Sequence, residues 1–169
     1  MQDWPTRTAV LEQTDYWQFS GRVAVKANND GFNGKLVWSQ RADNFSTTVS
    51  GPLGVGTVRI EGDRDEVTLI DGDGRKTTLK DAETDLYQRY GWTIPVTSLR
   101  YWALGIPDPA MPAETAVGDD GLLQELVQGG WTVTIGQYRD SAGQPMPRRV
   151  TAENAETRVR LVIDRWLFF

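Results

Sequence analysis

The sequence predicts a mainly β fold in which one antiparallel sheet curls into a barrel or half-barrel, with two helices over its concave face. Three observations support this prediction: apolar and polar residues alternate along most of the chain, turn signals separate the alternating runs, and the period changes in the middle. A sheet of nine or more strands accumulates twist and curls. At 169 residues, the chain is expected to form one domain, residues 1–169.

The first half of the chain predicts a meander of strands. In residues 17–25, apolar side chains or glycine occupy every second position, beginning at Trp17 and ending at Val25. Runs of the same kind follow at residues 32–38, 45–49, 57–61, 67–69 and 75–80. The stretch DGDG at residues 71–74 predicts a plain hairpin turn before the last of these runs, because Arg75 stands where a calcium loop needs another oxygen ligand.

The middle of the chain has the residue spacing of helices. Asp81 is expected to cap a helix that continues to Tyr90 and ends at Gly91. A second helix is expected to begin at Pro95 and to end at Gly105. A proline-rich loop, IPDPAMP at residues 106–112, follows this helix and is too short to be a linker between domains.

Strands resume in the last third of the chain. They are predicted at residues 122–128, 131–138 and 157–166. Gly129 and Gly130 provide a two-residue hairpin turn between the first two. A short amphipathic helix is indicated at residues 9–13, before the first strand.

The composition disfavours most hydrolytic mechanisms. The chain has no His and no Cys, so it cannot build a Ser-His-Asp triad, a thiol nucleophile or a typical zinc site. A hydrolase that uses paired carboxylates stays possible, but no spacing of acids points to a pair. The net charge of −5 argues against a nucleic-acid partner. We therefore expect a binding protein with no catalytic residue, no metal site and no cofactor.

The stretch SGPLGVG at residues 50–56 places a large aliphatic side chain in a turn. Pro52 and the flanking glycines favour a tight, exposed turn, so Leu53 is expected at or near its tip. A leucine left in water forgoes about 1.5–3 kcal/mol of burial energy. Two interpretations stay open: Leu53 folds back onto the sheet, or its exposure has a function.

Two further patterns each allow two interpretations. Periodicity alone leaves open whether side chains or a ligand fill the concave face of the sheet. The second pattern is a set of arginines, which we interpret as the solvated faces of neighbouring strands and a loop, or as a contact for an acidic partner or phosphate headgroups. These arginines are Arg148, Arg149, Arg158, Arg160 and Arg165.

Four stretches resemble the outer-membrane lipoprotein receptor LolB family of Gram-negative bacteria. They are FSGRVAVK at 19–26, SGPLG at 50–54, SLRYWALGIPDP at 98–109 and RVRLVIDRW at 158–166. The resemblance covers nearly all of the chain from about Trp17 onward. It implies a half-open antiparallel β-barrel, formed by a single curled sheet, with a helical lid inserted at about residues 81–105.

The resemblance also implies a function in lipoprotein transport. Members of the family accept triacylated lipoproteins from the periplasmic carrier LolA and release them into the phospholipid of the outer membrane. Pro52, Leu53 and Gly54 would then form a loop that aids membrane delivery. The acyl chains would occupy a cavity lined by aromatic and aliphatic side chains: Trp17, Phe19, Leu36, Trp38, Phe45, Leu99, Trp102, Trp131 and Trp166.

Two alternatives stay open beside this interpretation. One is a soluble barrel that binds a hydrophobic metabolite, and the other is a carrier of the LolA type. The family also implies a signal peptide and a lipidated cysteine, neither of which is present at the start of this sequence. We therefore expect this chain to be a soluble version of a protein that is lipid-anchored at the periplasmic face of the outer membrane.

Overall fold

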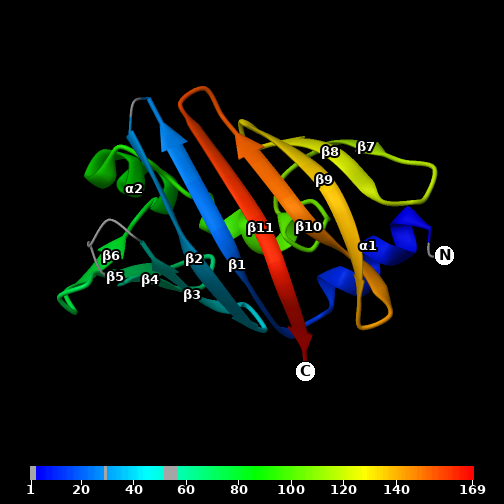
Figure 1. Cartoon of the computed structure of the whole chain (residues 1–169), viewed down its shortest axis with the longest axis horizontal. Helices are drawn as coiled ribbons and strands as arrows, with labels where there is room; N and C mark the ends of the chain where they lie inside the picture. Colours follow the sequence, from blue (N-terminus) through cyan, green and yellow to red (C-terminus); the bar gives the residue numbers. More distant parts are fainter. Residues whose placement is uncertain (1–2, 29, 52–56) are drawn as a thin grey trace.

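The computed structural model describes residues 3–28, 30–51 and 57–169. The predicted delivery loop, Pro52 to Gly54, lies outside these residues. Within them the chain forms eleven strands and three helices (Figure 1). The strands are β1 Tyr16–Ala27, β2 Asp30–Arg41, β3 Asn44–Ser50, β4 Thr57–Gly62, β5 Val67–Ile70, β6 Lys76–Leu79, β7 Glu114–Val117, β8 Leu123–Gln128, β9 Trp131–Ser141, β10 Gln144–Glu153 and β11 Thr157–Phe168. The helices are α1 Trp4–Glu12, α2 Ala82–Tyr90 and α3 Val96–Trp102.

The described strands form one antiparallel sheet. Its strand order is β6-β5-β4-β3-β2-β1-β11-β10-β9-β8-β7, so β1 and β11 pair at its centre. The edge strands β6 and β7 do not pair with each other, and the sheet curls without closing (Figure 1). The predicted fold class, mainly β with a single curled sheet in a half-open barrel, is confirmed.

The two predicted helices of the middle segment are also confirmed. Asp81 caps α2 by accepting a hydrogen bond from the backbone N–H of Thr84, and Gly91 ends the helix with a φ of 78°. Helix α3 follows directly after Pro95. The chain from residue 80 to residue 113 contains both helices. In Figure 1, α2 is drawn at the left, beside β2, and the later part of this segment passes behind β1, β11 and β10. We call residues 80–113 the lid segment.

Helix α1 is longer than the sequence predicted. It begins at Trp4 rather than at residue 9, because Asp3 caps it by accepting a hydrogen bond from Thr6 N at 2.8 Å. Its buried Arg7 donates to the backbone carbonyl of Pro145 at 2.7 Å. This bond attaches α1 to the hairpin between β9 and β10.

Two strands have no counterpart in the prediction. Strand β10 contains Pro145 and Pro147, and proline in a run argues against a central strand. The register between β9 and β10 shifts on both sides of Arg149, so the prolines lie next to an irregular part of the ladder. Strand β7 is an exposed edge strand without alternation, and periodicity cannot detect it.

A β-bulge decides which face of β11 carries Trp166. Val159, Leu161 and Ile163 point into the core, so strict alternation would place Arg165 inside and Trp166 outside. The register between β1 and β11 shifts at Ser20 and Gly21, which inserts one extra residue on β11. Trp166 therefore lies opposite Phe19 and packs on the core.

Gly21 is required at this bulge. A Cβ atom at this position would meet the carbonyl oxygen of Val162 at 2.0 Å. Because that oxygen belongs to the backbone of the neighbouring strand, only glycine allows the two strands to approach this closely.

Candidate functional site

The inner face of the sheet and the lid segment enclose one apolar core. All nine residues of the predicted lining belong to this core or pack against it. Eight of them are at most 6% exposed, and Trp166 is partly buried. The eight are Trp17, Phe19, Leu36, Trp38, Phe45, Leu99, Trp102 and Trp131.

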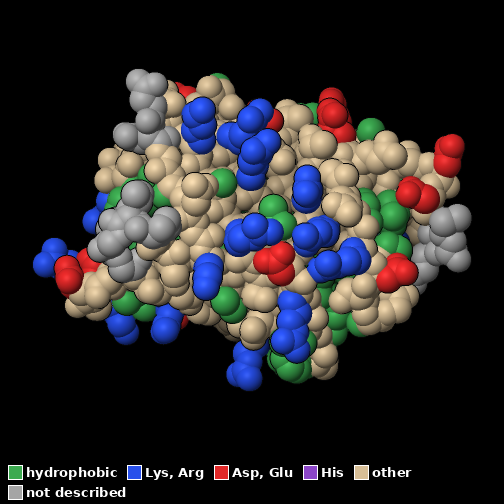
Figure 2. All heavy atoms as spheres, viewed as in Figure 1, with side chains coloured by type: hydrophobic (Ala, Val, Ile, Leu, Met, Phe, Trp, Pro, Cys, Tyr) green, Lys and Arg blue, Asp and Glu red, His purple; other side chains and the backbone are tan. Residues whose placement is uncertain are grey.

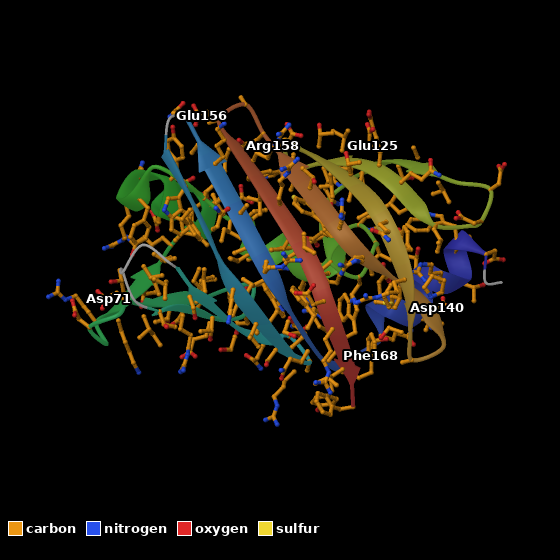
Figure 3. All side chains as sticks on the ribbon, viewed as in Figure 1. Asp71, Glu125, Asp140, Glu156, Arg158 and Phe168 are labelled. Carbon is orange, nitrogen blue, oxygen red and sulfur yellow. The ribbon has the colours of Figure 1, made fainter. Side chains whose placement is uncertain are left out.

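Strands β1, β2, β3 and β11 contribute an aromatic layer to this core. The ring centroids of Phe19 and Trp38 are 6.1 Å apart, and those of Trp38 and Phe45 are 5.1 Å apart. Trp166 lies 5.2 Å from Phe19 and 5.4 Å from Trp17. These distances are typical of favourable aromatic pairs. The layer continues along β11 to Phe168, near the C-terminal end of the strand (Figure 3).

The lid segment supplies the opposite side of the core. Trp102 of α3 lies 6.4 Å from Trp131 of β9, measured between ring centroids. Further buried side chains of this segment were not among the predicted lining residues: Ile94, Val96, Leu104 and Ile106. The resemblance to the family implies mainly aromatic lining residues, whereas these four are aliphatic residues next to prolines and turns.

In this structure eight of the nine predicted lining residues are buried in the core and shielded from water. Trp38 and Trp102 have no exposed surface at all. A ligand that contacts these side chains therefore needs the lid segment to move away from the sheet. The free-energy cost of this movement depends on the polar contacts between the lid segment and the sheet.

The buried carboxylate of Asp108 is the centre of one such contact. Asp108 follows α3 and is 1% exposed. It accepts hydrogen bonds from Ser98 Oγ at 2.8 Å and from Arg64 Nη2 at 2.7 Å. Because Ser98 lies on α3 and Arg64 lies in the turn between β4 and β5, this carboxylate ties the lid segment to the sheet.

The buried amide of Gln128 provides the second contact. Its Oε1 accepts hydrogen bonds from Trp102 Nε1 and from the backbone N–H of Asp108, both at 2.9 Å. Its Nε2 donates to the carbonyls of Asp108 at 2.7 Å and Met111 at 2.9 Å. Both N–H donors of this amide and both lone pairs of its oxygen therefore have hydrogen-bond partners. We call Arg64, Ser98, Trp102, Asp108 and Gln128 together the lid latch.

The sequence contains one signal for the latch that the prediction did not use. Gln128 occupies an inward position in a strand whose other inward residues include Leu126. A polar residue at such a position requires a buried hydrogen-bond partner. Which partner it finds depends on the lid, so the network itself cannot be derived from periodicity.

Glu83 connects the first lid helix to the sheet. Its Oε2 accepts a hydrogen bond from Trp131 Nε1 at 3.1 Å, and its backbone carbonyl accepts one from Thr93 Oγ1 at 2.8 Å. Burial raises the pKa of Glu83, and the nearby charge of Asp81 adds to this increase, while the hydrogen bond from Trp131 opposes it. Folding therefore shifts this carboxyl toward its protonated form relative to the unfolded chain.

Glu83→Gln is expected to remove one component of the pH dependence of stability. Because folding raises the pKa of Glu83, its protonated carboxyl stabilises the folded state. This stabilisation is complete below the ordinary pKa of glutamate and is lost as the pH rises through the pKa of the folded state. The wild-type chain should thus lose stability relative to the variant across this window. Urea unfolding at several pH values measures the difference.

Trp131→Phe provides the internal control for this prediction. It removes the only hydrogen bond that opposes the shift, so the pKa of Glu83 should rise further and the window should move to higher pH. If the stabilities of wild type and Glu83→Gln changed with pH in parallel, the raised pKa of Glu83 would be contradicted.

Five buried side-chain polar atoms have no hydrogen-bond partner among the described residues: Arg7 Nε, Trp17 Nε1, Thr47 Oγ1, Arg100 Nε and Thr157 Oγ1. Trp17 belongs to the aromatic layer, and Thr47 lies opposite Trp38. An unsatisfied buried donor costs about 1–3 kcal/mol. Trp17 Nε1 and Thr47 Oγ1 are available to a carbonyl oxygen that enters the core.

The described part of the chain offers neither a metal-ligand cluster nor a membrane-spanning helix. It contains no group of three or more acidic side chains arranged to hold a metal ion. None of its helices has the length and apolar character needed to cross a bilayer.

Comparison with known proteins identifies relatives over almost the whole chain. The family model described as outer membrane lipoprotein LolB matches residues 15–166. An outer-membrane lipoprotein LolB of Nitrosococcus oceani is 37% identical over 166 residues, which cover 98% of this chain and 83% of the relative. The LolB of Francisella tularensis subsp. tularensis is 31% identical over 171 residues, covering 95% of this chain and 82% of the relative.

Solved structures share the fold at much lower sequence identity. A LolA superfamily protein of Nitrosomonas europaea superposes with a TM-score of 0.65 at 7% identity, covering 100% of this chain and 94% of that chain. A DUF1329 family protein of Desulfovibrio piger gives a TM-score of 0.65 at 6% identity, covering 96% and 89%. At these identities the likeness concerns the curled sheet and its helices.

Proposed function

Because the chain belongs to the outer membrane lipoprotein LolB family, we propose that it accepts lipoproteins from a LolA-type carrier and releases them into the outer membrane. In this proposal the acyl chains of the lipoprotein bind between the curled sheet and the lid segment. The observation that carries it is the meeting of all nine predicted lining residues in one apolar core between the sheet and the lid segment, with Leu99 and Trp102 on the lid side.

The apolar core accounts for affinity without specific hydrogen bonds. Each methylene removed from water contributes about 0.8 kcal/mol, so three long acyl chains provide more binding energy than reversible transfer needs. Part of this energy is used to displace the lid segment and to break the contacts of the latch. Trp17 Nε1 and Thr47 Oγ1 would gain partners if ester or amide carbonyls entered the core.

Release into the membrane is proposed to need no energy source. A bilayer holds acyl chains more favourably than a protein layer, so the last step is downhill. The difficulty is kinetic, since acyl chains cross water slowly. Insertion of Leu53 into the lipid interface would shorten the aqueous path that the acyl chains must cross. This role for Leu53, Pro52 and Gly54 is part of the proposal.

The relatives are named outer-membrane lipoproteins, which supports an outer-membrane location for this protein. We place it at the periplasmic face, attached by a lipid anchor in its full-length form. A carrier of the LolA type, triacylated lipoproteins and outer-membrane phospholipid are the proposed partners.

Arg64→Ala is expected to accelerate the entry of acyl chains. The substitution leaves the buried carboxylate of Asp108 without its cationic partner, which should lower the free energy of unfolding by about 2 kcal/mol. Because the same bond fixes the lid segment, a neutral fluorescent acyl probe should bind several-fold faster. Stopped-flow fluorescence measures the rate, and urea unfolding measures the stability.

Arg158→Ala is the matched control for this prediction. Its ion pair with Glu153 measures 3.3 Å, but both side chains are about half exposed, so the pair contributes little. This variant should bind the probe at the wild-type rate. Equal rates for wild type and Arg64→Ala would exclude the latch as a barrier to entry.

A competition experiment distinguishes the proposed lipoprotein receptor from a carrier of small hydrophobic metabolites. The bound acyl probe should be displaced by a triacylated lipopeptide at a much lower concentration than by a free fatty acid. Better displacement by the free fatty acid, or by a pigment, would favour the metabolite carrier.

A further inference from the structure

Positive charge is concentrated on five neighbouring strands of the sheet, although the chain as a whole is acidic with a net charge of −5. Strands β1, β2, β9, β10 and β11 contain more than half of the 18 Lys and Arg residues but few of the 23 Asp and Glu residues. The cations are Arg22, Lys26, Lys35, Arg41, Arg139, Arg148, Arg149, Arg158, Arg160 and Arg165, and the acids are Asp30, Asp140, Glu153 and Asp164. The remaining elements therefore carry most of the negative charge.

The cations at the centre of this region lie on the outer face of the sheet, away from the lid segment. The inward residues Val23, Val159 and Leu161 are buried, and the residues that alternate with them, such as Arg22 and Arg160, are exposed. Figure 2 shows this face, with blue side chains gathered over the central strands and one acidic group among them. We call it the outer basic face.

The register of the strands brings cations from four strands side by side. Lys35 on β2 lies opposite Arg22 on β1. Arg22 lies opposite Val162 on β11, and Val162 lies opposite Arg149 on β10. Arg160 lies opposite Ala24, one row further along the strands. Like charges on neighbouring strands repel each other, so a bound anion would relieve this repulsion.

The acids on this face neutralise only part of the charge. Asp164 approaches Arg22 at 3.6 Å and Arg148 at 3.5 Å, and Glu153 approaches Arg158 at 3.3 Å. Among the described carboxylates, none lies within 4.0 Å of Lys35, Arg149 or Arg160. These three exposed cations are available to an external anion.

A hollow of about 700 Å³ lies within the outer basic face. Arg22, Lys35 and Arg160 line it together with the small apolar side chains of Ala24 and Val162. Cationic groups around an apolar floor suit a ligand with a phosphate and an adjacent hydrocarbon part. Ser50 and Gly51, which directly precede the predicted delivery loop, also line the hollow.

We propose that the outer basic face docks on a bilayer through the headgroups of anionic phospholipids. Arginine predominates among its cations, and the guanidinium group binds phosphate oxygens in a bidentate manner. The contact of Ser50 and Gly51 with the hollow favours a membrane over an acidic protein, because the loop proposed to touch lipid begins there. The inference rests on the proposed function, and it adds an electrostatic contact to the single apolar contact of Leu53.

Vesicle binding of the full chain tests this inference. The double variant Lys35→Gln/Arg160→Gln removes two cations that line the hollow. Since a basic side chain near an anionic surface contributes about 1 kcal/mol, binding to phosphatidylcholine vesicles that contain phosphatidylglycerol should weaken about 30-fold at low salt. Wild-type binding should fall with added salt and should be much weaker to phosphatidylcholine alone.

Arg75→Gln/Lys76→Gln is the matched control, because it removes the same charge from exposed positions elsewhere. Arg75 follows the hairpin turn that contains Asp71, and Figure 3 shows Asp71 at the left edge of the molecule, away from the central strand that carries Arg158. The control variant should bind vesicles like wild type. Equal binding by wild type and the Lys35→Gln/Arg160→Gln variant would overturn the inference.

The same variants separate the other outcomes. The inference is wrong if phosphatidylglycerol does not increase the vesicle affinity of wild type and the Lys35→Gln/Arg160→Gln variant instead loses affinity for the carrier protein. The outer basic face would then bind an acidic protein. Binding of a neutral acyl probe, measured without vesicles, should be unchanged in the double variant. Absence of probe binding in wild type would refute the proposed function, while the vesicle results would still decide the role of the outer basic face.

Discussion

Leu53→Glu is expected to reduce delivery of a lipoprotein to liposomes at least about tenfold, while acyl binding stays nearly unchanged. Insertion of a leucine side chain into the lipid interface gains about 1.5–3 kcal/mol, and a glutamate in its place adds the cost of burying a charge. The measurement combines a transfer assay to liposomes with equilibrium binding of an acyl probe.

Val127→Glu controls for the added charge. Val127 lies on β8, is 40% exposed, and also exchanges an apolar side chain for an acidic one. Delivery by this variant should match that of wild type. If Leu53→Glu lost acyl binding and delivery to the same extent, the leucine would have a structural role and the delivery loop would be refuted.

Trp102→Asp should produce the largest loss of acyl binding, about 100-fold or more, because it places a carboxylate in the apolar core. Trp102 is fully buried, packs on Trp131 and donates to Gln128, so this variant should also be destabilised by several kcal/mol. Thermal unfolding must therefore accompany the binding measurement.

Trp102→Phe keeps the prediction testable if the aspartate variant does not fold. It retains an aromatic ring but removes the hydrogen bond to Gln128, which should cost about 1 kcal/mol of stability. Its acyl affinity should remain within about threefold of wild type, since most of the apolar contact is kept. A loss of affinity as large as that of Trp102→Asp would show that the indole N–H, and not the apolar core, determines binding.

Much of the fold could be predicted because it depends on local sequence patterns. Alternation located β1 and β11, and the Asp81 cap with Gly91 located α2. Strand β10 escaped prediction because its prolines contradict strand propensity, and its place in the ladder depends on irregular pairing with β9. Helix α1 was predicted only in part, because the amphipathic pattern at residues 9–13 covers only its C-terminal end and its start depends on the cap at Asp3.

The candidate site was less accessible from the sequence. Resemblance to a family identified the tryptophans of the lining, but the inward position of Trp166 depends on a bulge that periodicity does not reveal. The lid latch joins residues far apart in the sequence, such as Arg64 and Asp108. Such contacts follow from tertiary packing, so only the structure could provide them.

The central claim is that acyl chains bind between the curled sheet and the lid segment. Quenching of tryptophan fluorescence by a lipopeptide with brominated acyl chains tests it most directly, because bromine quenches only on close approach and five of the chain's seven tryptophans were predicted to line the site. The account predicts saturable quenching of most of the emission, together with increased hydrogen exchange in the lid segment. Saturable binding that leaves the tryptophan emission unchanged would place the acyl chains elsewhere and contradict the account.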